Sequence, residues 1–320
     1  MNAPTRFAPL PYTQTSAGEP RLTGVEVEFS GLDIEQTTRI VQDSLGGASK
    51  GDDPFLRSVV DTSIGDIEVE LDTPIRHASD NKFVRHGLDA AAVVVPMEII
   101  TEPLDHDGLM TFNGFLSDLR DAGAAGSRSG VFLGFGVHLN PEVVSLKSPH
   151  TINTIRAYGL LEAYLRRVEA VDMTRRALPF VEPWPADFLT ALCDQDIETL
   201  AQLLPIAAKH ISSRNHGLDI LPLLKFAQPE AYGQHFTETK SNARPTFHFR
   251  LPDCRIDEPD WDLNQPWELW RLVERVAAHP AAIGDLASAW KQRRTGIFQT
   301  RAWAEDTASV LRKYDLEVAS

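Results

Sequence analysis

The chain has 320 residues, 42% of them hydrophobic and 8% aromatic, which is the composition of a globular protein with a sizeable buried core. Its formal net charge of −14 argues against a surface for nucleic acid or anionic membranes, because both need basic patches. Two cysteines are too few for a disulfide framework or a zinc site, and the lack of a secretory signal or membrane-spanning apolar run predicts a cytoplasmic protein.

The first 20 residues are rich in Pro, Thr, Ser and Gly and are predicted to form a disordered tail outside the fold. Residues 21–320 are then expected to form a single domain. Helical spacing of apolar residues predicts a helical insert at about 148–217 and C-terminal helices at about 265–313. The tryptophans of the C-terminal helices are expected to pack in the core.

Residues 24–29 alternate between apolar and acidic side chains, which is typical of a strand. Val25, Val27 and Phe29 would share one face, and Glu26 and Glu28 the other. This pattern fits either a half-solvated antiparallel strand or a site in which paired carboxylates hold divalent cations.

Two later stretches repeat the theme. Residues 66–72 place Glu68 and Glu70 on one face, and residues 96–103 carry Glu98. Carboxylates on one side of a shared sheet repel each other unless cations or arginines neutralise them. The recurrence therefore favours a cation-binding face.

Local signals place further elements around these strands. A helix is predicted to begin after Asp33 and end at Gly46, and others are expected at 80–93 and 105–123. Residues 56–72 are typical of a hairpin. Residues 46–54 predict a surface loop and not a nucleotide P-loop, because no Gly-Lys-Ser/Thr follows.

Residues 131–140 predict another strand, one face of which carries Gly134, Gly136 and His138. The two glycines leave open space beside the imidazole, as where a ligand approaches a strand. His138 is either a hydrogen-bonded structural histidine or part of a binding site.

Residues 245–253 alternate in the same way. Phe247, Phe249 and Leu251 are predicted to face inward, with His248 and Arg250 on the opposite face.

Taken in order, six segments resemble the ATP-dependent amidoligases that share the catalytic fold of glutamine synthetase and glutamate-cysteine ligase. They are residues 24–29, 61–64, 98–104, 136–139, 214–219 and 247–250. The resemblance covers roughly residues 22–260. It implies an α+β fold in which a mostly antiparallel, curved sheet carries the active site on one face and packs helices on the other.

The resemblance also implies roles for individual residues. Carboxylates of the first and third acidic strands would bind the Mg²⁺ ions of ATP, a strand histidine would lie in the nucleotide region, and arginines would contact phosphate or acyl phosphate. The implied metal ligands are Glu26, Glu28 and Glu98, with Glu70 added by strand geometry; the nucleotide region includes His138, Gly136, Gly134 and Arg250; and the catalytic residues are Arg250, Arg214 and Glu98.

Two positions depart from the pattern of relatives. Gly136 stands where relatives often have the first histidine of a His-x-His motif, and His248 stands where they often have glutamate before the arginine. If both positions adjoin one metal, His248 replaces the imidazole lost at Gly136 and becomes a metal ligand with Glu26. A nitrogen donor would favour Mn²⁺ over Mg²⁺.

The function implied by the resemblance is ATP-dependent ligation of a carboxylate to an amine through an acyl phosphate, with small-molecule or peptide substrates. No nucleic-acid or membrane partner is expected, and the sequence specifies neither the two substrates nor an oligomeric state. Two alternatives use the same residues: a metal-dependent hydrolase or phosphotransferase, and a non-catalytic nucleotide- or metal-binding protein.

Overall fold

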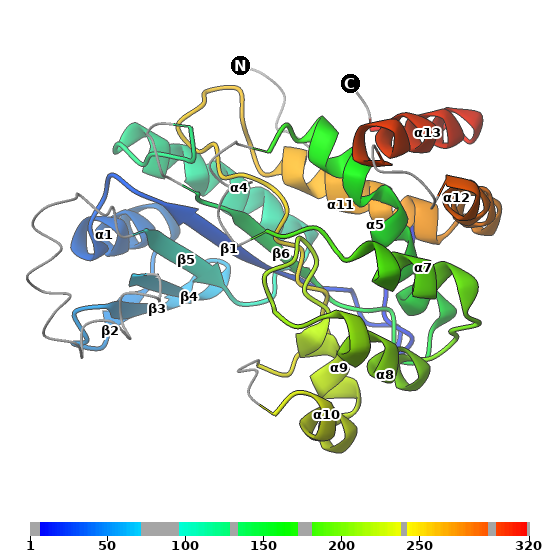
Figure 1. Ribbon diagram of the computed structural model, residues 1–320. Helices are drawn as coiled ribbons and strands as arrows, with labels where there is room; N and C mark the ends of the chain where they lie inside the picture. The colour runs from blue at the N-terminus through cyan, green and yellow to red at the C-terminus, as the bar shows by residue number, and fades with distance from the viewer. Residues whose placement is uncertain are drawn as a thin grey trace, which may run out of the picture.

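The computed structural model describes residues 7–71, 96–128, 134–171, 181–237, 242–293 and 299–318. Within these ranges the chain forms six strands and ten helices (Figure 1). This confirms the predicted α+β class. The helix expected at 80–93 lies outside the described residues.

The strands form one open antiparallel sheet in the order β2-β3-β4-β5-β1-β6. Their bounds are β1 Thr23–Phe29, β2 Ala48–Lys50, β3 Leu56–Thr62, β4 Gly65–Leu71, β5 Met97–Thr101 and β6 Val137–Pro141. The β3–β4 hairpin agrees with the prediction, whereas β2 lies within the segment expected to be a loop. Because β1 pairs with both β5 and β6, its side chains have neighbours on either side.

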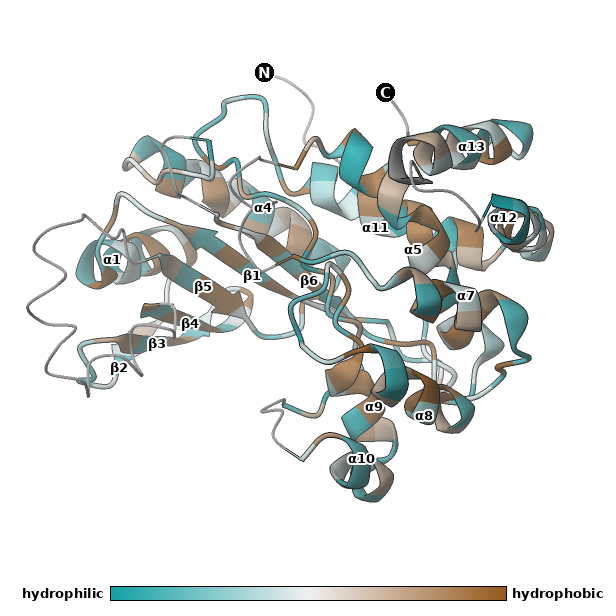
Figure 2. Ribbon diagram, in the orientation of Figure 1, coloured by the Kyte–Doolittle hydropathy of each residue, from teal (hydrophilic) through white to brown (hydrophobic). Residues whose placement is uncertain are grey.

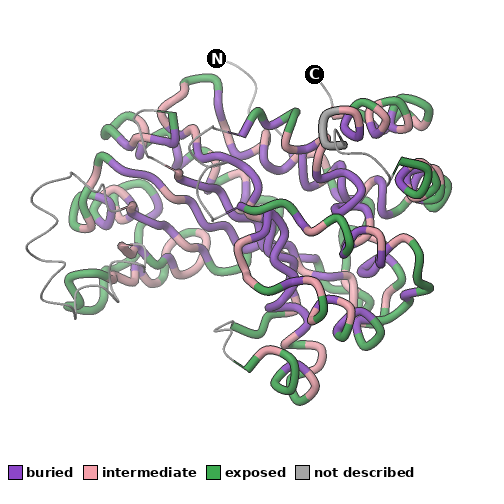
Figure 3. The backbone as a smooth tube through the Cα atoms, viewed as in Figure 1, coloured by how far each residue is buried: buried purple, intermediate pink, exposed green. Residues whose placement is uncertain are grey.

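One face of the sheet is apolar and packs against helices. Val25, Val27 and Phe29 of β1 are fully buried, as the alternation predicted. Helix α1 (Ile34–Leu45) contacts β3 and β4, and α11 (Asn264–Ala277) contacts β6, while α4 (His106–Asp121) packs against α1 (Figures 1 and 2). Figure 3 shows the central strands as a continuous buried core.

The first helix begins and ends where local signals place it. The Asp33 side chain accepts a hydrogen bond from the Gln36 backbone N–H, and the Gln36 side chain accepts one from the Asp33 backbone N–H, which forms a capping box. At the other end Gly46 has a φ of +78°, a conformation that favours glycine.

The remaining helices lie on the β6 side of the sheet (Figure 1). Their bounds are α5 Pro149–Val168, α7 Ala186–Asp194, α8 Leu200–His210, α9 Leu221–Ala227, α10 Pro229–His235, α12 Pro280–Arg293 and α13 Gln299–Lys313. Helix α5 contacts α11, α12 and α13. Trp267, Trp270, Trp290 and Trp303 are all buried, which confirms their packing role.

Residues 245–253 lie along the outer edge of β6 and do not form a regular strand. Isolated bridges join Leu139 to Phe249 and Glu142 to Thr246. Phe247, Phe249 and Leu251 are buried, as predicted.

The N-terminal segment differs from the expected tail over residues 1–20. Phe7 and Leu10 are buried in the hydrophobic core, and the Phe7 ring meets Trp267 edge-on at a centroid distance of 5.8 Å. A few apolar side chains anchor a segment whose overall composition is polar. Among the described helices, none combines the length and hydropathy needed to cross a membrane.

Candidate functional site

The polar face of the sheet brings acidic residues of three strands into one row. In the register of β1, Glu28 lies opposite Glu98 of β5, and Glu98 lies opposite Glu70 of β4. On its other side, β1 places Glu26 opposite His138 of β6. Like charges directly opposite each other in a sheet are destabilising, so this row requires positive charge nearby.

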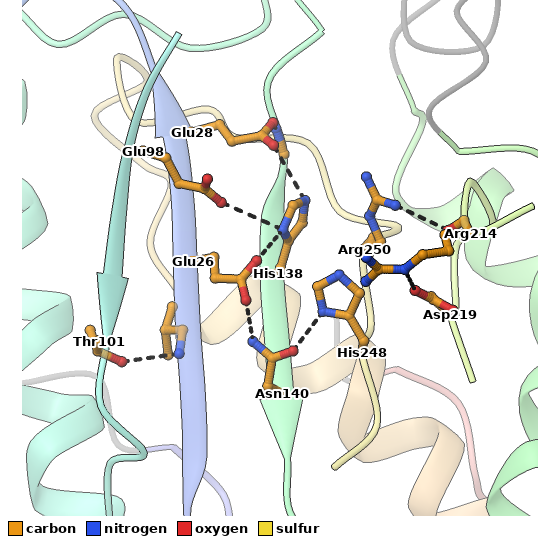
Figure 4. A network of polar contacts seen from close by, with 12 residues as sticks. Glu26, Glu28, Glu98, Thr101, His138, Asn140, Arg214, Asp219, His248 and Arg250 are labelled. Atoms are coloured by element: carbon orange, nitrogen blue, oxygen red, sulfur yellow. Dashed lines mark hydrogen bonds and ion pairs between the residues drawn. The ribbon is translucent and has the colours of Figure 1, made fainter. Parts of the chain in front are cut away.

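His138 lies at the centre of the carboxylates (Figure 4). Its Nδ1 is 2.8 Å from Glu26 Oε2 and 3.9 Å from Glu98 Oε1, and its Nε2 is 3.5 Å from Glu28 Oε1. The imidazole is 5% exposed, so these contacts form in an environment that largely excludes water.

Glu26 is held by donors on both carboxylate oxygens. Oε2 contacts His138 Nδ1, while Oε1 accepts a hydrogen bond from Asn140 Nδ2 at 2.9 Å and lies 3.4 Å from Arg244 Nη1. Burial by itself would raise the pKa of Glu26, but His248, His138 and Arg244 hold that pKa well below its ordinary value. Glu26 is therefore ionised at neutral pH.

His248 joins the cluster from the bridged segment beside β6. Its Nδ1 is 2.6 Å from Asn140 Oδ1, and its ring centroid is 5.2 Å from that of His138. Burial lowers the pKa of His248 well below its ordinary value, although the Glu26 carboxylate acts in the opposite direction. His248 faces the site and is itself buried.

The glycine that precedes β6 contributes through its backbone. The N–H of Gly136 donates to Glu28 Oε2 at 2.6 Å and so helps to orient that carboxylate. Gly134 was predicted to lie within a strand. In the structure it precedes β6 and is outside the regular strand.

Two arginines lie beyond His248. Arg250 Nη1 donates to the Arg214 carbonyl oxygen at 3.1 Å, and Arg214 Nε donates to Asp219 Oδ2 at 2.8 Å (Figure 4). Burial raises the pKa of Asp219 above its ordinary value despite this partner. The loop before α9 carries Arg214, and the bridged segment beside β6 carries Arg250.

A cavity of about 50 Å³ opens beside His248. It is lined by Asn140, Arg214, Pro222, Asn242, Arg244, Thr246 and His248. A cavity of about 370 Å³ lies elsewhere, between the N-terminal segment, the start of α4 and Trp267, and none of the predicted site residues lines it. The small, arginine-lined cavity is the one that belongs to the carboxylate cluster.

Among the residues that the structure describes, two overlapping groups of side chains have the geometry to hold a metal ion. One consists of Glu26, His138 and His248, and the other of Glu28, Glu98 and His138; within each group the donor atoms lie within 4.8 Å of one another. Carboxylate oxygens are the donors that Mg²⁺ and Mn²⁺ prefer, and imidazole nitrogens suit transition-metal ions. The mixed donor set therefore fits a divalent cation.

The structure thus brings together the predicted residues Glu26, Glu28, Glu98, His138 and His248. Glu70 is next to Glu98 in the sheet but belongs to neither metal-capable group.

Sequence analysis assigned no role to two residues of the site, Asn140 and Arg244. Alternation does place Asn140 on the same face as His138, because it lies two positions further along β6. Arg244 carries no comparable signal, since its chain segment is irregular.

A protein-family model described as "Putative amidoligase enzyme" matches residues 19–272. The chain belongs to this amidoligase family. The matched region contains all six strands and every residue of the carboxylate cluster. No match to this amidoligase is found among the curated proteins.

Proposed function

We propose that this amidoligase uses ATP to join a carboxylic acid to an amine, and that its catalytic region has the fold of glutamine synthetase and glutamate-cysteine ligase. The observation that carries the proposal is the convergence of Glu26, Glu28, Glu98 and His138 on one face of the antiparallel sheet. Such a carboxylate-rich face is suited to cations that carry a triphosphate.

Glu28, Glu98 and His138 would hold the cations, with Glu70 a further candidate from β4. When bound, the cations neutralise charge on the triphosphate and on the transferred group. His138 and the backbone at Gly134 and Gly136 would border the nucleotide.

The reaction proceeds in two steps. A carboxylate oxygen of the acid attacks the γ-phosphorus of ATP, and the bond to the bridging oxygen breaks to release ADP. The amine then attacks the acyl carbon, phosphate leaves, and the nitrogen loses a proton to a carboxylate base. Arg250 and Arg214 would stabilise negative charge on the transferred phosphoryl group.

Hydroxylamine offers a test that does not require knowledge of the natural amine, because it converts acyl phosphates to hydroxamates. The purified chain is incubated with ATP, Mg²⁺ or Mn²⁺, hydroxylamine and a panel of amino acids and dicarboxylic acids. We expect ADP and hydroxamate to appear in equal amounts with at least one acid. Glu98→Gln should reduce both products by about 100-fold or more. The substitution removes a ligand of the cation that would stabilise negative charge on the transferred phosphoryl group.

Glu19→Gln is the matched control, because Glu19 is exposed and belongs to neither metal-capable group. ADP formation without an acid would show a hydrolase, and ATP binding without any turnover would show a non-catalytic protein. Either result would overturn the ligase proposal.

A further inference from the structure

The loop that carries Arg214 is bonded to the segment that carries Arg250. The backbone N–H of Arg250 donates to the Gly217 carbonyl oxygen at 2.8 Å, and that of Asp219 donates to the His248 carbonyl oxygen at 3.0 Å. Side chains add to this link, because Arg250 Nη1 donates to the Arg214 carbonyl oxygen and Arg214 Nε donates to Asp219 (Figure 4). The positions of both arginines therefore depend on the backbone between Gly217 and Asp219.

Buried side chains of the helical layer hold the same backbone from its other side. Trp184 Nε1 donates to the Leu218 carbonyl oxygen at 3.0 Å, and the Trp184 backbone N–H donates to Glu162 Oε2 of α5 at 2.9 Å. Glu162 Oε1 accepts from the Tyr158 hydroxyl at 3.1 Å and lies 2.8 Å from Arg166 Nη2, which balances the buried charge. Tyr158, Glu162 and Trp184 are each exposed by 6% or less. These three residues therefore form a buried support that joins α5 to the loop.

The Tyr158 hydroxyl lies directly against Gly217. A Cβ on Gly217 would be 2.3 Å from the hydroxyl oxygen, which is well inside van der Waals contact. The Tyr158 ring is itself fixed, because it meets the rings of Trp184 and Phe249 edge-on at centroid distances of 4.9 and 6.2 Å. Tyr158 therefore sets how closely the loop approaches α5, and only glycine fits at position 217 without displacing one of them.

We propose that Tyr158, Glu162 and Trp184 are positioning residues, through which helix α5 determines where the guanidinium groups of Arg214 and Arg250 lie. They act through the backbone of the loop. The inference rests on the proposed function for the role of the two arginines, but the contacts that carry it involve neither ATP nor a cation. A displacement of about 1 Å in a group that stabilises the transition state can cost about 100-fold in rate.

Gly217→Ala tests the support, because its methyl group pushes the loop away from the Tyr158 hydroxyl. We expect kcat for ADP and hydroxamate formation to fall by about 100-fold. The KM for ATP should change by less than about threefold, since the arginines act on charge that develops in the transition state. Trp184→Phe, which removes the donor to Leu218, should lower kcat in the same direction by about tenfold. It is the second test if Gly217→Ala does not fold, and a circular dichroism melt checks both variants.

Tyr158→Phe supplies a rescue, because loss of the hydroxyl oxygen makes room for the added methyl group. By itself it should lower kcat by less than about fivefold, since it removes a single hydrogen bond. In the double variant with Gly217→Ala, kcat should be about tenfold or more above that of Gly217→Ala. Tyr164→Phe, on the same helix, is the matched control and should rescue nothing.

Amide hydrogen exchange, followed by NMR on the full chain, measures the position of the loop without turnover. The N–H groups of Asp219 and Arg250 should exchange about tenfold faster in Gly217→Ala, because their bonds across the loop are strained. Exchange should slow again in the double variant with Tyr158→Phe.

Two results would overturn the proposal. One is a double variant that is neither more active nor better protected than Gly217→Ala. The other is a set of folded variants whose melting temperatures fall while kcat and exchange stay at wild-type values, which would show a structural role alone. Failure of the proposed function is separate: a wild-type chain that makes no hydroxamate loses the ligase activity, while hydrogen exchange still tests the support.

Discussion

Three glutamates, Glu28, Glu98 and Glu70, lie side by side across the sheet and repel one another. Glu28 and Glu98 are direct neighbours across two strands, and Glu70 follows on the third. His138 and the Gly136 N–H offset part of their repulsion from the β6 side. Without a bound cation, the remaining repulsion among these carboxylates destabilises the folded state. Such a loss of stability is common at functional sites.

This repulsion gives a prediction for Glu98→Gln in protein stripped of metal with EDTA. We expect the free energy of unfolding to rise by up to about 1 kcal/mol, because a charge opposite Glu28 and Glu70 disappears. Addition of Mn²⁺ should stabilise the wild type but stabilise the variant much less. Urea unfolding with and without metal measures both effects, and a less stable metal-free variant would contradict the argument.

At the scale of elements, the turn after β1 sets how α1 meets the rest of the fold. Gly31 has a φ of +90°, and a Cβ on it would lie 2.3 Å from the Gly123 carbonyl oxygen at the end of α4. The backbones of the two turns are therefore in direct contact, and only glycine fits between them.

Gly31→Ala should destabilise the protein by about 1–3 kcal/mol, since the substitution strains the turn or pushes α4 away. Gly114→Ala is a control within α4 itself, because a Cβ there meets nothing within 4 Å. That substitution should instead stabilise by about 0.8–1 kcal/mol through helix propensity. Thermal unfolding compares the two, and equal effects would rule out the predicted contact.

At the scale of the whole molecule, a buried ion pair joins parts distant in sequence. Arg21 Nη1 and Nη2 donate to Glu274 of α11 at 2.8 and 2.7 Å, and Arg21 also donates to the carbonyl oxygens of Tyr12 and Glu142. His150 Nε2 of α5 lies 3.3 Å from Glu274. The N-terminal segment, the residue after β6, α5 and α11 thus meet at the Arg21–Glu274 ion pair.

The Arg21–Glu274 ion pair predicts how the free energy of unfolding depends on pH. Burial would raise the pKa of Glu274, but hydrogen bonds from Arg21 and His150 lower it below its ordinary value. A lowered pKa in the folded state contributes stability that is complete above the unfolded-state pKa, near 4.3, and is lost as the pH falls towards the folded-state value.

Glu274→Gln should therefore lower the free energy of unfolding by about 3–5 kcal/mol at pH 7, because Arg21 stays buried without its partner. The difference from wild type should shrink at acidic pH. Glu268→Gln is the control on the same helix, where a half-buried pair with Arg271 should contribute about 1 kcal/mol or less. Urea unfolding from pH 3 to pH 8 measures both, and a pH-independent difference would contradict the linkage.

Much of this arrangement was predictable from sequence, because it is local. Alternation determined that Glu26 and Glu28 share one face of β1 and that Val25 and Val27 share the other, since successive strand residues point to opposite sides. Asp33 and Gly46 likewise determined the limits of α1 through caps that act within a few residues.

Only the tertiary structure decided which faces meet. Alternation gives the side on which a residue lies but not its register, so the sequence could not place Glu26 opposite His138 or Glu28 opposite Glu98. The contact between Asn140 and His248 spans 108 residues and lies at an irregular segment, where no local periodicity applies. The residue types of the site are a property of the sequence, whereas their arrangement in space is set by long-range pairing of strands.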